Sequence, residues 1–158
     1  MNDYYSRHFT RREEANSFCT DEDQKNEGEV AKILERKWKI KLHRYCLFSP
    51  VDWWAERRGN LIGIVELKTR SHAAGKYSTV FLNVRKWLAL KLASIGLGVE
   101  SLFVVKFTDS LLWIKIKDID ASRHIIGGCK KIVKAKTDIE PVIEVPINTM
   151  NEIERTDK

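Results

Sequence analysis

Cysteine pairs, histidine motifs and long apolar segments are what this sequence lacks. Its three cysteines, Cys19, Cys46 and Cys129, are widely spaced and form no CxxC pair, which argues against a disulfide framework and a zinc ribbon. Its four histidines match neither HExxH nor any other metal-ligand spacing. No apolar run approaches the roughly 18 residues of a membrane-spanning helix, and the polar, charged start is unlike a signal peptide. We therefore expect a soluble, cytoplasmic protein without a membrane partner.

The composition is that of a globular protein with an excess of positive charge. A length of 158 residues suits one domain with a core of its own. Hydrophobic residues make up 43% of the chain and charged residues 32%, too apolar a mixture for wholesale disorder. The net charge of +6 favours a polyanionic partner, and nucleic acid is the first candidate.

The spacing of apolar residues predicts helices and strands in alternation. One helix is expected over 26–39, and strands over 40–47, 51–58, 61–69, 101–107, 111–116 and 142–146. A second, amphipathic helix is expected over 84–95, with Gly98 suited to end it. Its predicted apolar face consists of Trp87, Leu88, Leu92 and Ile95.

The same patterns suggest domain boundaries. Residues 1–26 carry mixed charges and few apolar side chains, so a flexible N-terminal arm is expected there. The domain is expected over 27–146, followed by a C-terminal tail over 147–158. The basic run Lys130–Lys136 is either a solvated loop or a segment that contacts phosphates.

One acidic pair and a lysine stand out within the predicted hairpin. Glu66 follows Asp52 by fourteen positions, and Lys68 follows Glu66 by two, so Glu66 and Lys68 share a strand face. The run before Glu66 is apolar at every position from Leu61, which is typical of a central strand covered on both sides. A carboxylate buried there costs several kcal/mol unless it is paired or binds a metal. Two simpler interpretations stay open: turn hydrogen bonds for Asp52, and an ion pair between Glu66 and Lys68.

This arrangement resembles the PD-(D/E)xK nuclease superfamily over roughly residues 27–117. Val51 stands where the superfamily's motif has proline, although Pro50 lies one residue earlier. The resemblance implies an α/β fold with the restriction-endonuclease-like αβββαβ core, a mixed central sheet flanked by helices. It also implies a nuclease that hydrolyses phosphodiester bonds of DNA with Mg²⁺ or Mn²⁺. The small size is similar to that of phage-encoded members.

The resemblance assigns roles to individual residues. Asp52, Glu66 and Lys68 would be catalytic, with Lys68 positioning the attacking water. The metal ligands would be Asp52, Glu66, the Leu67 carbonyl and Glu29 on the first helix, where Glu35 is the competitor. The candidates for contact with DNA are Arg70, Lys76, Tyr77 and Lys86.

Strand register gives the motif a geometric test. If Gly59-Asn60 formed a two-residue turn with regular pairing beyond it, Asp52 would oppose Leu67 and point away from Glu66. Both acids can reach one metal only if the hairpin contains a three-residue loop or a β-bulge. We therefore predict such an irregularity between Asp52 and Glu66.

Two other classes of function compete with the nuclease. The first is a module on the same fold that binds DNA or protein without cutting, and the second is a small basic assembly subunit. The sequence contains no evident second domain for reading a base sequence, which favours structure-dependent or low-specificity cleavage of DNA. A homodimer is compatible with the small size, and a resolvase would require one to cut opposing strands.

Overall fold

The computed structural model describes residues 21–46, 49–128 and 139–155. Its helices are α2 (Asp21–Trp38) and α3 (Val84–Leu97), and its 3-10 turns are η1 (Ala74–Lys76), η2 (Ile116–Asp118) and η4 (Ile147–Thr149). Its strands are β1 (Lys41–Arg44), β2 (Trp53–Arg57), β3 (Asn60–Thr69), β4 (Thr79–Asn83), β5 (Glu100–Lys106), β6 (Ser110–Lys115), β7 (His124–Gly128), β8 (Ile139–Pro146) and β9 (Asn151–Arg155). Apart from β4, which lies between β3 and α3 and belongs to a separate sheet, the order is α2, β1, β2, β3, α3, β5, which confirms the predicted αβββαβ core.

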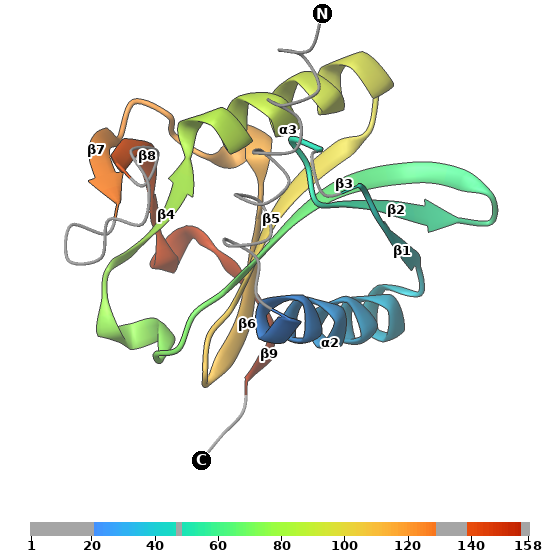
Figure 1. Cartoon of the computed structure of the whole chain (residues 1–158), viewed down its shortest axis with the longest axis horizontal. Coiled ribbons are helices and arrows are strands. Elements are labelled where there is room, and N and C mark those ends of the chain that lie inside the picture. Colours follow the sequence, from blue (N-terminus) through green and yellow to red (C-terminus); the bar gives the residue numbers. More distant parts are fainter. Residues whose placement is uncertain (1–20, 47–48, 129–138, 156–158) are drawn as a thin grey trace, which may run out of the picture.

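The strands form two sheets (Figure 1). The larger has the order β1-β2-β3-β5-β6-β9, in which β3 and β5 are parallel and the other neighbours antiparallel. The smaller has the order β4-β8-β7 and is antiparallel. A parallel pair needs a crossover connection, and the segment that contains α3 provides it between β3 and β5. The larger sheet is therefore the mixed central sheet that the sequence predicts.

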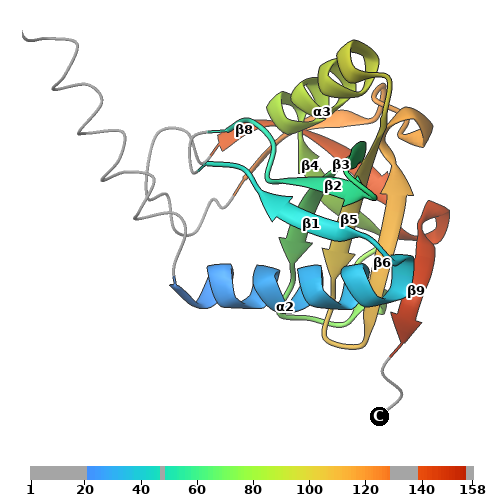
Figure 2. The ribbon, with the colours of Figure 1, turned by 90° about the vertical axis from the view of Figure 1, so that its right-hand side faces the viewer.

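The two helices lie on opposite sides of the larger sheet (Figure 2). Successive side chains of β3 point to opposite faces, so Val65 packs with Leu34 of α2 while Ile64 packs with Leu90 of α3. Strand β3 is thus buried on both faces, as predicted for a central strand. Glu66, two residues beyond Ile64, belongs to the face that α3 covers, and it is buried.

Each helix ends at a residue in the left-handed region of backbone space. Gly98 has φ 65° and donates its backbone N–H to the Ser94 carbonyl, which confirms it as the residue that ends α3. Lys39 follows the last residue of α2 with φ 53°, although glycine is the usual residue at this position.

The predicted apolar face of α3 is wrong for most of its length. Three of its side chains are largely exposed, at 47% for Leu88, 67% for Leu92 and 72% for Ile95. Leu90 is fully buried instead, and Trp87 is partly buried against the same core. Residues four apart lie on one face of a helix, so the rotation that buries Leu90 also turns Lys86 toward the sheet. The orientation of α3 therefore buries Leu90 and brings Lys86 to the sheet.

Three strands were not predicted, namely β4, β7 and β9. Strand β9 lies within 147–158, the expected C-terminal tail, and pairs with β6 at the edge of the larger sheet. Within the expected N-terminal arm, residues 21–26 are part of α2, and residues 1–20 lie outside the described part of the chain. The basic run Lys130–Lys136 also lies outside it. Neither described helix is long and apolar enough to cross a lipid bilayer.

Candidate active site

Asp52 and Glu66 meet because the β2–β3 hairpin is irregular. The turn is formed by Arg58 and Gly59, with Arg57 paired to Asn60, one residue earlier than predicted. The register then shifts between Ala55 and Glu56, after which Trp53 pairs with Val65. Continued by one residue, this register places Asp52 opposite Glu66, on the same face of the ladder. The predicted irregularity is confirmed as a β-bulge.

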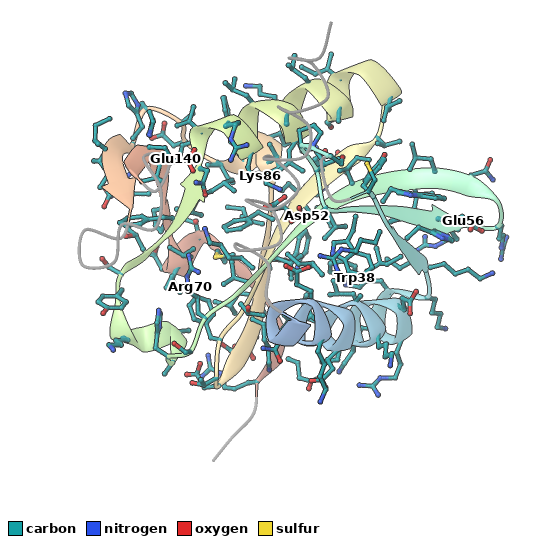
Figure 3. All side chains as sticks on the ribbon, in the orientation of Figure 1. Trp38, Asp52, Glu56, Arg70, Lys86 and Glu140 are labelled. Atoms are coloured by element: carbon teal, nitrogen blue, oxygen red, sulfur yellow. The ribbon has the colours of Figure 1, made fainter. Side chains whose placement is uncertain are left out.

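Lys86 lies between the two carboxylates. Its Nζ is 2.6 Å from Asp52 Oδ1 and 3.2 Å from Glu66 Oε2, and it donates a hydrogen bond to each. Lys86 occupies the first turn of α3, so the helix carries the ammonium group to the sheet from above, as Figure 3 shows. The three side chains form a small charged cluster at the edge of a hydrophobic core.

Burial and charge change the protonation of this cluster. Burial, and after it the charge of Asp52, raise the pKa of Glu66 to about 8, although Lys86 acts in the opposite direction. Burial lowers the pKa of Lys86, but the charges of Glu66 and Asp52 outweigh burial, so the net pKa lies above the usual value. Two carboxylates this close repel each other, and a cation between them is what holds both in place.

Lys68 shares the face of Glu66 but makes a different contact. Its Nζ donates to the Phe81 carbonyl of β4 at 3.0 Å, and no salt bridge joins Lys68 to Glu66 among the described residues. Burial, and then the charge of Arg70, lower the pKa of Lys68 to about 8. An amine with this pKa is partly neutral near pH 8, which suits a group that orients or activates water.

The acids of α2 are not part of this cluster. Glu29 is exposed on α2, the helix on the opposite side of the sheet from Glu66. Glu35 accepts a hydrogen bond from the Leu42 backbone N–H, and Glu27 pairs with Arg44 at 3.0 Å. Within the part of the chain that the structure describes, no three His, Cys, Asp or Glu side chains gather around one point. The acidic part of the cluster therefore consists of Asp52 and Glu66.

The other predicted DNA contacts lie around a neighbouring pocket. Arg70 and Tyr77 line a pocket of about 250 Å³ together with Phe81, whose carbonyl accepts from Lys68. Lys76 extends its Nζ over the Tyr77 ring, 5.5 Å from the centroid. A cationic side chain and an exposed ring are therefore next to the strand that carries Lys68.

Sequence reasoning missed Asn83 and Glu140. The side chain of Asn83, the last residue of β4, donates a hydrogen bond to Glu140 of β8, and Arg85 lies 3.8 Å from the same carboxylate. The charge of Glu140 also acts on Lys68, raising its pKa against the effect of burial. No local pattern marks Glu140, because only the pairing of β4 with β8 brings it near β3.

The cluster fits a divalent cation. Asp52 and Glu66 already share one cationic group, the Lys86 ammonium, so the space between them accommodates positive charge. Carboxylate oxygens are the ligands that Mg²⁺ prefers, and Mg²⁺ keeps several waters, so that two protein carboxylates are enough.

Comparison with models of protein families identifies the family of this chain. The model of the family described as "Phage putative PDDEXK endonuclease" matches residues 12–153. The chain belongs to this family. The match includes both helices and all the described strands, except the last residues of β9. The PDDEXK endonuclease family therefore accounts for nearly all of the described fold, and not only for the Asp-Glu-Lys motif.

A solved structure supports the fold of this PDDEXK family member. The Holliday junction resolvase Hjc of the archaeal hyperthermophile Archaeoglobus fulgidus matches it with a TM-score of 0.50 and 14% sequence identity. The match covers 77% of this chain and 86% of the resolvase. At 14% identity the similarity concerns the fold alone, which is the restriction-endonuclease-like fold. The comparison with curated proteins finds no match.

Proposed function

We propose that this nuclease-family protein is a divalent-metal-dependent DNA endonuclease of structure-dependent or low sequence specificity. The observation that supports it best is the convergence of Asp52 and Glu66 on a single cationic group, Lys86 Nζ. A purely structural hairpin would gain nothing from two adjacent carboxylates, one of them buried.

The proposed metal ligands are Asp52, Glu66 and the Leu67 carbonyl. Such an ion, when bound, neutralises charge and polarises the scissile phosphodiester. Mn²⁺ has similar ligand preferences to Mg²⁺, and either ion suits this donor set. Glu29 stays a prediction without support from the geometry, because it is exposed on α2.

The two lysines have separate roles in this proposal. Lys68, held at 3.0 Å from the Phe81 carbonyl, orients the attacking water and takes up its proton when neutral. Lys86 neutralises Asp52 and Glu66 in this structure, and its ammonium group would be available to a phosphate oxygen if a metal ion were held by the two acids. The predicted contact of Lys86 with DNA is then made at the site itself.

DNA is the proposed substrate because of the family and the charge of +6. The described residues form two sheets, and both helices pack on the larger one. The solved structure that it resembles is a Holliday junction resolvase, so a four-way junction belongs among the substrates to be tested. A homodimer stays a prediction, to be measured by light scattering.

The test is cleavage of supercoiled plasmid, single-stranded DNA and a four-way junction with Mg²⁺, Mn²⁺ or EDTA. Asp52→Asn, Glu66→Gln and Lys68→Met are compared with wild type. Glu100→Gln is the matched control, because Glu100 is an exposed acid that pairs with Lys117. Metal-dependent cutting that the three variants lose and the control keeps would support the proposal.

Two results would contradict the proposed function. Cutting that persists in EDTA would exclude the metal dependence. DNA binding without cutting in any condition would favour the alternative function, a module that binds DNA on a nuclease-like fold.

A further inference from the structure

A cationic surface lies away from the candidate active site, at the outer end of the β2–β3 hairpin. There the hairpin and the end of α2 enclose a groove of about 690 Å³. Its charged lining residues are four cations and one acid, namely Lys39, Lys41, Arg57, Arg58 and Glu56. The groove is therefore strongly positive.

Two of these charged groups already have structural partners. Glu56 accepts a hydrogen bond from the Gly59 backbone N–H and pairs with His43. These two contacts, and after them the charge of Lys41, lower the pKa of Glu56. Arg57 Nη2 donates to the carbonyl of Trp38, the last residue of α2, at 2.8 Å. These contacts fix the hairpin against the helix and so give the groove a defined shape.

Lys39 and Arg58 are exposed, as are Lys41 and Arg57. Within the described ranges the side chains of Lys39 and Arg58 take part in no salt bridge or hydrogen bond. Their charges are therefore available to a ligand.

The backbone of the same two residues is unusual. Lys39 and Arg58 both have φ 53°, and no other non-glycine residue in the described part of the chain has a positive φ. Lys39 follows the end of α2, where glycine or asparagine is favoured. Arg58 is the first residue of a two-residue hairpin turn, where asparagine, aspartate or glycine is favoured. Backbone fit alone would not select a long cationic side chain at either position, and both positions face one groove.

We propose that this groove binds the phosphate backbone of the DNA duplex about six base pairs from the bond that is cut. The proposal rests on the proposed nuclease function, which supplies the duplex. Strand β2 links the two places: Asp52 directly precedes it and Arg58 directly follows it, and Figure 3 shows Asp52 near the centre of the molecule with Glu56 far out on the hairpin. Six residues at about 3.4 Å each span about 20 Å. This corresponds to about six base pairs of B-DNA at roughly 3.4 Å per phosphate of one strand.

The experiment removes the charges of Lys39 and Arg58 and keeps the backbone conformation at both positions. Lys39→Gly, Arg58→Gly and the double variant are compared with wild type in the full chain. The control is Lys25→Gln with Lys32→Gln, which removes the same charge from exposed positions of α2. Binding of a fluorescent duplex is measured over a range of salt concentrations, in EDTA and in Ca²⁺. Melting temperature and plasmid cleavage are measured in parallel.

The expected result is a loss of binding without a loss of stability. Each lost phosphate contact lowers the slope of log K against log salt by about 0.9, so the double variant loses about 1.8. Its Kd rises at least tenfold near 0.1 M salt, and its KM for plasmid rises while kcat at saturating DNA stays unchanged. The melting temperature stays the same or rises, because glycine adopts a positive φ without strain. The control keeps the salt slope of the wild type.

Several outcomes would overturn the proposal. A double variant with the slope and affinity of wild type, while wild type still cuts, would exclude the groove and leave the nuclease function standing. An equal loss in the control would mean that net charge, and not this groove, is responsible. A wild-type protein that neither binds nor cuts DNA would overturn the groove and the nuclease function together.

Discussion

Lys86 Nζ lies 2.6 Å from Asp52 Oδ1, although the two residues belong to different layers of the fold. The contact joins α3 to the start of β2 and neutralises a pair of acids that would otherwise repel each other. Substitution of Lys86 by methionine removes the ammonium group and keeps an aliphatic side chain of similar length.

Lys86→Met should destabilise the metal-free protein by about 1–3 kcal/mol, because a buried carboxylate pair loses its counter-ion. Urea denaturation in EDTA measures this. Mg²⁺ should then raise the melting temperature of Lys86→Met more than that of wild type. Lys91→Met, an exposed lysine of the same helix, is the control. A variant as stable as wild type in EDTA would show that the cluster does not need Lys86.

The double variant Lys86→Met with Glu66→Gln separates charge from packing. If the loss in Lys86→Met comes from the unpaired acids, then the neutral glutamine should restore most of the stability. No recovery would mean that the aliphatic packing of Lys86 is what the single variant loses.

Glu66→Gln should change how stability depends on pH. The pKa of Glu66 rises from 4.5 to about 8 in the folded protein. Between these values folding takes up a proton, so wild type loses stability as pH rises through this window, whereas glutamine does not titrate. The stability advantage of Glu66→Gln should therefore be larger at pH 8.5 than at pH 4.5. Urea denaturation in EDTA at both values measures it, and a constant difference would contradict the raised pKa.

The sequence predicted the parts of this protein that depend on local patterns. Strand β3 could be predicted because its apolar run is unbroken from Leu61 to Val65, and the end of α3 because Gly98 permits a left-handed backbone. The β-bulge could be predicted from the alternation of side chains along a strand. With the predicted two-residue turn and regular pairing, Asp52 and Glu66 would point to opposite faces, so an irregularity was required. Its position, between Ala55 and Glu56, has no signal in the sequence.

The features that depend on contacts between distant parts of the chain were not predicted. Strand β4 is short and its partner β8 lies far along the chain, so the approach of Glu140 to Asn83 could not be foreseen. The exposed face of α3 was predicted as its apolar face because Leu88, Leu92 and Ile95 have the spacing of a buried stripe. The competing requirement, that Lys86 reach Asp52 and Glu66, acts through space and leaves no periodic pattern.

The orientation of α3 gives a matched pair of leucine variants. Leu90→Ala should destabilise the protein by about 2–5 kcal/mol, because Leu90 is fully buried. Leu92→Ala, two residues along the same helix, should change stability by about 0.5 kcal/mol or less, because 67% of that side chain is exposed. Thermal and urea denaturation of both variants measure the difference. Equal losses would mean that the helix is rotated from the orientation described above.

Lys68→Met should separate catalysis from stability. Burial lowers the pKa of Lys68 to about 8, so the charged form is disfavoured in the fold and its removal should change stability by only about 1 kcal/mol. The rate of a single turnover should fall by about 10²- to 10⁴-fold, the usual contribution of a positioned acid–base group. In wild type the rate should rise with pH until about pH 8 and then level off, because the neutral amine accepts the proton of water. A variant that keeps more than about one tenth of the rate would remove Lys68 from the mechanism. A wild-type rate that falls above pH 8 would instead assign the role to the protonated form, as an electrostatic partner of the phosphate.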